Sequence, residues 1–116
     1  MEMALLLKDG DYVADERGGL RTVEGAQDLL QRVLFRLQAR RGSFPFLPEL
    51  GSRLYLLSRE KPGDRPALAR QYAAEALRGE DVEVTGVTVE ESQPGRLRVG
   101  VDMEWNGVHL SAEVTV

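Results

Sequence analysis

The chain has 116 residues, enough for one domain built around one hydrophobic core. It contains no cysteine, which excludes disulfide bonds and thiolate metal sites and is usual in a reducing compartment such as the bacterial cytoplasm. Its formal net charge of -4 argues against a general nucleic-acid-binding protein, because such domains are normally basic. The N-terminal run of three leucines is too short for a signal peptide or a membrane span. We therefore expect a soluble protein in which residues 1–116 form a single domain.

The first part of the chain predicts a short β segment followed by a helix. Residues 1–22 join an apolar run to the turn-rich sequence KDGDYVADERGGL, which is typical of an irregular strand or hairpin. Thr22 can cap the helix that follows, and Gly42 can end it in a left-handed conformation. The sequence thus predicts a helix over residues 23–41. Its apolar face consists of Ala26, Leu30, Val33, Leu34 and Leu37.

Residues 42–63 are expected to form an apolar crossover segment without regular structure, because prolines and glycines interrupt them. A second helix is predicted over residues 64–79, with Asp64 as its cap and Pro66 in its first turn. Small residues dominate its apolar face, which predicts close packing on a sheet or helix. That face consists of Leu68, Ala69, Tyr72, Ala73 and Ala76.

The last third of the chain predicts a three-stranded antiparallel sheet over residues 82–116. Strands 96–105 and 108–116 alternate apolar and polar residues on either side of Asn-Gly, a two-residue turn that places Trp105 opposite Val108 and fixes the register. In the preceding strand the apolar phase slips by one residue across Gly86, which indicates a bulge or bend. We predict an α+β fold, a small antiparallel sheet of three to five strands with two helices packed on one face, against which Trp105 is largely buried.

Residues that could carry chemistry are few, and no catalytic site is predicted. His109 is the only histidine, and its position opposite Glu104 favours a solvated pair over a metal or catalytic role. The carboxylate pairs Glu90–Glu91 and Glu80–Asp81 could serve a glycosidase, but their polar surroundings favour solvated strand ends. No phosphate-binding glycine loop, hydrolase motif or dinucleotide fingerprint occurs. We therefore expect no cofactor, no metal and no small-molecule substrate.

Two groups of residues are candidates for contacts with a protein partner. Arg32, Arg36 and Arg40 follow one another at helical spacing, where they could bind phosphate or form an exposed face paired with Asp28. The acidic chain favours a protein partner over nucleic acid. In the crossover segment, Phe44, Phe46 and Leu47 could either tuck under the first helix or face a partner.

The run VEGAQDLLQRVLFRLQARRGSFPFLPELGSRLYLL resembles the small baseplate wedge proteins of contractile phage tails, the lysozyme-like or sheath-initiator family, including forms from Mu-like prophages. In that family an amphipathic helix precedes an arginine or threonine, a glycine, an apolar stretch, a proline and Gly-Ser-x-Leu. One departure is that many members have Glu-Pro-Arg where this chain has Glu80-Asp81-Val82. The matching positions are Gln31, Arg32, Arg41, Gly42, Pro48, Leu50, Gly51, Ser52, Arg53 and Leu54.

The resemblance implies a non-catalytic assembly protein that nucleates the tail sheath. It implies sheath subunits and other baseplate proteins as partners, with a location in the host cytoplasm during assembly and then in the tail baseplate. In such proteins extended arms of sheath subunits add strands to the sheet. At least one outer strand is expected to keep unpaired backbone groups unless residues 3–7 cover it, and Glu113 and Thr115 on the C-terminal strand are the expected partner contacts. The alternatives are a peptidoglycan-cleaving hydrolase, as the lysozyme-like name suggests, and a small nucleic-acid-binding regulator.

Overall fold

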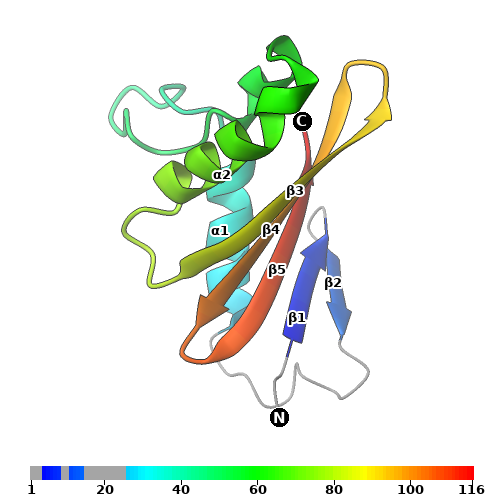
Figure 1. Ribbon diagram of the computed structural model, residues 1–116. Helices are drawn as coiled ribbons and strands as arrows, with labels where there is room; N and C mark the ends of the chain where they lie inside the picture. The colour runs from blue at the N-terminus through cyan, green and yellow to red at the C-terminus, as the bar shows by residue number, and fades with distance from the viewer. Residues whose placement is uncertain (1–3, 9–10, 15–25) are drawn as a thin grey trace.

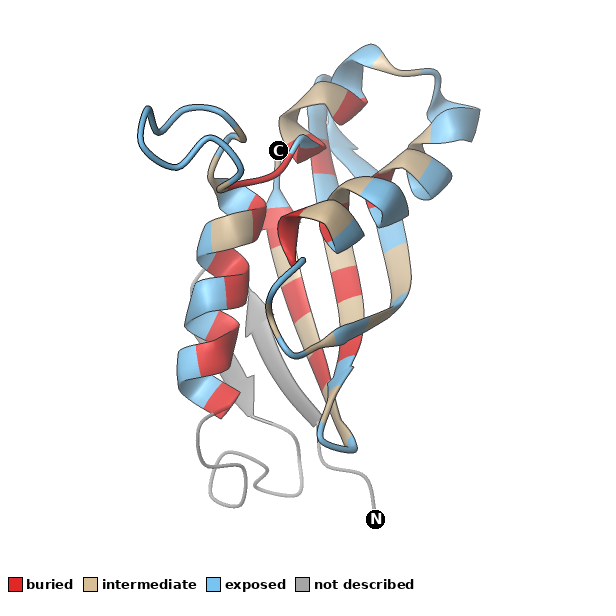
Figure 2. Cartoon of the chain, turned by 90° about the vertical axis from the view of Figure 1, so that its left-hand side faces the viewer, coloured by how far each residue is buried: buried red, intermediate tan, exposed pale blue. Residues whose placement is uncertain are grey.

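The computed structural model describes residues 4–8, 11–14 and 26–116, which form one sheet and two main helices (Figure 1). The strands lie side by side in the order β2-β1-β5-β4-β3, and both α-helices cover one face of the sheet (Figure 2). The α+β prediction is therefore confirmed. The strands are β1 (Ala4–Lys8), β2 (Asp11–Ala14), β3 (Glu83–Gln93), β4 (Arg96–Trp105) and β5 (Val108–Thr115). The helices are α1 (Ala26–Gln38) and α2 (Arg65–Ala76), with the short 3-10 helices η2 (Leu54–Arg59) and η3 (Pro62–Asp64) between them.

Helix α1 buries the predicted apolar stripe against the sheet, which is visible in Figure 2 as a buried band along the helix. The predicted residues 23–25, like the expected cap Thr22, lie outside the described part of the chain. At the other end the helix stops at Gln38, three residues before the predicted end. Gly42 has a φ of +87° but is not its cap, because it lies in the turn closed by the Ser43 N–H and the Arg40 carbonyl oxygen. Leu29 joins the predicted stripe in the core.

The segment between the helices is more regular than predicted. Leu54 and Leu57 belong to η2 and are fully buried. Their spacing of three residues matches the period of a 3-10 helix, so both side chains lie on the same side of it. Helix α2 begins after Asp64, which occupies the cap position without a side-chain hydrogen bond, and Pro66 lies in the first turn as expected. The fully buried residues of α2 are Ala69, Ala73 and Ala76, so this helix approaches the sheet closely, mainly over β3.

The β4–β5 hairpin has the predicted register. Asn106 and Gly107 both have positive φ, as a two-residue hairpin turn requires, and Trp105 pairs with Val108. Trp105 is only partly buried at the end of the core, so the prediction of a largely buried tryptophan is wrong. Away from the turn, the inward residues of the hairpin are buried: Leu97, Val99, Val101, Met103, Leu110, Ala112 and Val114. The register of β3 against β4 shifts between Val84 and Gly86, which confirms the irregularity expected there.

The N-terminal strand covers the C-terminal one, the exception that the sequence left open. β1 pairs in parallel with β5 from His109 to Glu113, so β5 is an inner strand along this stretch and does not form a free edge there. β1 and β2 also form an antiparallel pair, as expected for a hairpin in residues 1–22. Among the described strands, the two edges are β2 and β3. No helix in the described ranges is long and apolar enough to cross a membrane.

Candidate partner-binding site

The apolar loop, residues 42–50, projects from a base in which backbone hydrogen bonds join residues 39–41 to Ser52. The Ser52 N–H donates to the Ala39 carbonyl oxygen at 2.8 Å, and the Arg41 N–H donates to the Ser52 carbonyl oxygen at 3.0 Å. The Ser52 hydroxyl is buried and donates to the Leu37 carbonyl oxygen at 2.6 Å. It also accepts a hydrogen bond from the Leu54 N–H at 3.3 Å. These contacts explain why Gly-Ser-x-Leu follows the loop, because Ser52 joins the end of α1 to the start of η2.

The loop itself is also held by internal hydrogen bonds. The Leu47 N–H donates to the Phe44 carbonyl oxygen, and the Leu50 N–H donates to the Leu47 carbonyl oxygen. The Arg41 side chain donates to the Glu49 carbonyl oxygen at 3.0 Å across the loop. The backbone of the apolar loop is therefore fixed before any partner binds, which lowers the entropy cost of binding.

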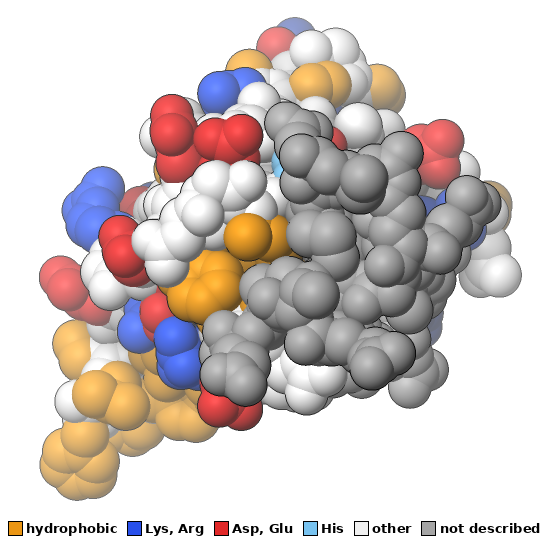
Figure 3. Space-filling model, turned by 90° about the horizontal axis from the view of Figure 1, so that it is seen from below, with side chains coloured by type: hydrophobic (Ala, Val, Ile, Leu, Met, Phe, Trp, Pro, Cys, Tyr) orange, Lys and Arg blue, Asp and Glu red, His pale blue; other side chains and the backbone are white. Residues whose placement is uncertain are grey.

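The hydrophobic side chains of the apolar loop point into solvent. Phe46 is 94% exposed and Leu47 is 57% exposed, while Phe44 is partly shielded by Phe35 of α1, whose ring centroid lies 6.0 Å away. Seen from below, hydrophobic side chains form a protrusion at the corner of the molecule where this loop lies (Figure 3). Of the two alternatives left open by the sequence, Phe46 and Leu47 have the exposed one, whereas Phe44 lies against the first helix. Neighbouring exposed apolar side chains of this kind are typical of contact surfaces.

The arginines of α1 are paired differently from the prediction. The Arg36 Nε lies 3.0 Å from Glu80 Oε2, and the Arg32 Nε lies 3.3 Å from Glu80 Oε1. Their partner is thus Glu80, beyond the end of α2, and not Asp28 in the same helix. The Glu80 side chain is only 9% exposed, so the interpretation of this carboxylate as a solvated strand end is wrong. Arg40 lies apart from this pair, with its guanidinium 4.9 Å from the centre of the Tyr55 ring.

A second carboxylate is shared by two arginines in the same way. Glu75 Oε1 lies 3.4 Å from Arg53 Nε and 3.7 Å from Arg41 Nε. This oxygen is buried and has no hydrogen-bond partner, so the two ion pairs are its only compensation in the described part of the chain. Because Arg41 belongs to the loop base and Glu75 to α2, the contact attaches the apolar loop to the second helix.

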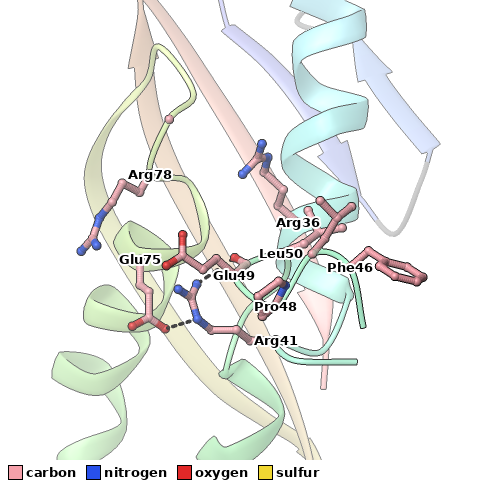
Figure 4. Close-up of a pocket in the computed structure, with 10 residues that line it drawn as sticks. Arg36, Arg41, Phe46, Pro48, Glu49, Leu50, Glu75 and Arg78 are labelled. Atoms are coloured by element: carbon pink, nitrogen blue, oxygen red, sulfur yellow. Dashed lines mark hydrogen bonds and ion pairs between the residues drawn. The ribbon is translucent and has the colours of Figure 1, made fainter. Parts of the chain in front are cut away.

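Two adjacent hollows flank the apolar loop, and together we call them the loop groove. The larger hollow, about 450 Å³, is lined by Arg41 and Glu49 of the loop region and by Glu75 and Arg78 at the end of α2. Figure 4 shows Arg78 and Phe46 on opposite sides of it. The smaller hollow, about 340 Å³, lies against Phe35 on the outer face of α1. Arg36 and Leu50 line both hollows. Sequence reasoning found the loop and Arg36 but missed Glu75 and Arg78, since their approach depends on how the helices pack.

The remaining candidates lie on the face of the sheet that the described helices do not cover, where they form surface pairs. His109 stands opposite Glu104 as predicted, but its Nε2 lies 3.7 Å from Asp102 Oδ1, which also accepts a hydrogen bond from the Ser111 hydroxyl at 2.7 Å. Glu90 is exposed and lies 3.5 Å from an Arg98 nitrogen. Within the ranges that the structure describes, no cluster of three or more histidine, aspartate or glutamate residues could hold a metal ion.

The two partner contacts predicted on the C-terminal strand lie away from the loop groove. Glu113 stands opposite Gly100 of β4 and beside Lys8 of β1, and its Oε1 lies 3.5 Å from Arg98 Nε. Thr115 follows, beyond the residues of β5 that pair with β1. The structure therefore separates the predicted contacts into a loop group and a sheet group.

Comparison with solved structures finds this fold in the crystal structure of a "putative tail lysozyme" from Geobacter sulfurreducens. The TM-score is 0.64, over 81% of this chain and 91% of that chain, at 15% sequence identity. At this low identity the likeness concerns the fold. No protein-family model matches the chain. No curated protein matches it either.

Proposed function

We propose that this chain is a non-catalytic structural component of a contractile phage or prophage-derived tail baseplate, on which the first ring of sheath subunits forms. The fold likeness to a protein called a tail lysozyme supports this proposal, together with the Gly51-Ser52-x-Leu54 resemblance. The protein is then made in the host bacterial cytoplasm and ends in the tail baseplate. Its partners are sheath subunits and other baseplate proteins, and it requires no cofactor, nucleic acid or membrane.

The observation that carries the proposal is the edge strand β3. It is 11 residues long and has β4 as its one neighbour among the described strands. A long edge strand presents a row of backbone donors and acceptors, which risks aggregation in a free protein and accepts an added strand in an assembly. Glu83, Glu90 and Glu91 are exposed along it, as expected of an edge that charge protects from unwanted pairing.

The hydrogen-bond alternation shows which β3 residues point to the free edge. Leu97 uses both its N–H and its carbonyl oxygen to pair with Val116, so its backbone groups face β5. In an antiparallel sheet the next residue, Arg98, must then face β3, where it stands opposite Glu90. Glu90 therefore faces β4, and the backbone groups of Val89 and Glu91 face the open side.

The test is to remove one outward donor without removing an inward one. We expect Val89→Pro to fold but to give tails without sheath, because proline cannot donate to an incoming strand. The matched control is Val89→Ala, which removes at least as much of the valine packing and keeps the N–H, and we expect it to give sheathed tails. Electron microscopy of particles made with each variant is the measurement.

A second variant guards against unfolding. Glu91→Pro removes another outward donor at an exposed position, so it costs little packing. Thermal melts of both purified proline variants show whether the fold survives. Normally sheathed tails carrying a folded proline variant at either position would contradict the strand-addition proposal.

One observation favours the hydrolase as a second candidate. Glu49 and Glu75 line the same hollow, and glycosidases generally use two carboxyl groups that face each other across a cleft. Against it, Glu75 is engaged by Arg41 and Arg53. A peptidoglycan turbidity assay on the purified protein distinguishes the two proposals. Clearing that is lost in Glu49→Gln or Glu75→Gln would replace the structural proposal with the enzymatic one.

A further inference from the structure

We propose that the loop groove binds an acidic segment of a partner protein, which inserts a bulky apolar side chain beside Phe46 and Leu47 and places carboxylates near Arg36 and Arg78. This surface is separate from the β3 edge, so the inference goes beyond the proposed function and does not depend on it. Three observations carry it: the shape of the groove, the exposed and preorganised apolar loop, and the excess of positive charge.

The shape fits an elongated occupant. The two hollows share Arg36 and Leu50, so they lie next to each other, one on the outer face of α1 and one at the end of α2. With volumes of about 450 Å³ and about 340 Å³, each hollow has room for at least one large side chain. A peptide segment that crosses Arg36 and Leu50 can reach both.

The apolar loop supplies the anchor. Phe46 is 94% exposed, so packing within this chain does not explain an aromatic side chain at this position. Its neighbour Leu47, and Phe35 in the adjoining hollow, are also at least half exposed. The loop base is fixed by Ser52, so Phe46 is presented on a rigid support. Exposed aromatic side chains on a preformed backbone are typical of residues that contribute most to the affinity of an interface.

The charges define what the partner carries. Four guanidinium groups, those of Arg32, Arg36, Arg41 and Arg53, lie in or next to the loop groove with three carboxylates, those of Glu49, Glu75 and Glu80, so positive charge is in excess by one. Arg78 adds to this excess, because it is exposed and has no acidic partner in the part of the chain that the structure describes. Guanidinium groups bind carboxylates with paired, charge-assisted hydrogen bonds. In a chain of net charge -4, this local excess favours an acidic partner.

The other occupants are less consistent with these observations. Single-stranded nucleic acid uses aromatic side chains and arginines, but it also requires an unbroken cationic track. Here Glu49 and Glu75 interrupt the groove. A second copy of the chain could bring the acidic residues Asp81, Glu83 and Glu104 beside its hairpin turn, but Trp105 next to them is only partly exposed and does not project as an anchor. Both occupants are outcomes of the test.

The experiment uses the full chain and fluorescence anisotropy. The probe is a short fluorescein-labelled peptide that alternates glutamate with leucine and carries one tryptophan, and its matched peptide has lysine in place of glutamate. We expect the acidic peptide to bind and the basic one not to bind. Arg78→Glu and Phe46→Ala should each weaken binding of the acidic peptide about tenfold or more. Because both side chains are exposed, neither variant should unfold the protein.

The matched control is Arg70→Glu, which reverses the charge of an exposed arginine on α2 that does not line the groove. Its affinity should stay within about twofold of the wild type, the scatter expected of a remote surface charge. The proposal is overturned if the acidic peptide does not bind at about millimolar concentration, a level typical of weak peptide contacts. Equal binding of the basic peptide, an equal effect of Arg70→Glu, tighter binding of a single-stranded oligonucleotide, or dimerisation lost in Phe46→Ala would also overturn it.

Discussion

Gly51 lies against the backbone of Ala39, so closely that a Cβ atom on residue 51 would stand 2.6 Å from the Ala39 carbonyl oxygen. The same atom would stand 2.8 Å from the backbone of Arg40 and of Arg41. Gly51 also has a φ of +103°, a conformation that side chains with a Cβ rarely adopt. The glycine of Gly-Ser-x-Leu is thus explained by the crossing of the two chain segments that close the base of the apolar loop.

The first prediction follows from this contact. Gly51→Ala should lower the free energy of unfolding by about 2 kcal/mol or more, because it combines backbone strain with a clash against backbone atoms that cannot move aside. Urea unfolding followed by circular dichroism measures the change.

The control for this prediction is Gly42→Ala. Gly42 also has a positive φ, but nothing lies within 4 Å of the position that a Cβ atom would take there, so the substitution carries strain without a clash. We expect a cost of about 1 kcal/mol for Gly42→Ala. Equal losses in the two variants would show that the close approach at Gly51 has no energetic role.

The second prediction concerns the arginine clamp around Glu80. Glu80→Gln should destabilise the protein by about 1–3 kcal/mol. The substitution removes the negative charge of a nearly buried carboxylate, which two guanidinium groups share. The contribution of Arg32 should be the smaller one, since it is 56% exposed against 29% for Arg36. Thermal unfolding of Glu80→Gln, Arg32→Gln and Arg36→Gln gives the order.

An exposed ion pair serves as the comparison for the clamp. Glu90, whose side chain is 72% exposed, pairs with Arg98, and Glu90→Gln should change stability by no more than about 0.5 kcal/mol. If Glu80→Gln proves as mild as Glu90→Gln, the clamp does not stabilise the attachment of α1 to the segment after α2.

Local sequence patterns correctly predicted the elements whose conformation depends on neighbouring residues. The Asn106–Gly107 turn fixes the β4–β5 register by itself, since both residues adopt the positive φ that a two-residue loop needs. The stripe of α1 repeats at helical spacing, and all its predicted members are buried. The slip at Gly86 predicted an irregularity in β3 because a strand cannot change phase without one.

Most of the features that the sequence did not predict depend on residues that lie far apart along the chain. The short apolar run Leu5–Leu7 predicts a strand but not its neighbour, so the parallel pairing of β1 with β5, which removes the C-terminal edge, could not be read from it. In the same way, Glu80 has a polar sequence context and becomes nearly buried only because α1 brings two arginines to it. Periodicity alone also missed η2, because its six residues are too few to establish a repeat.

The third prediction compares two apolar residues at the turn end of the hairpin. Met103 is fully buried, whereas Trp105, two residues later on the same side of β4, is only partly buried where the core ends. Met103→Ala should therefore cost about 2–5 kcal/mol, as expected for a large-to-small change in a core. Trp105→Ala should cost less, about 1–2 kcal/mol, although it removes the larger side chain. Urea titrations of both variants test the order. A greater loss for Trp105→Ala would mean that the ring is covered in solution, and that the core extends to the Asn106–Gly107 turn.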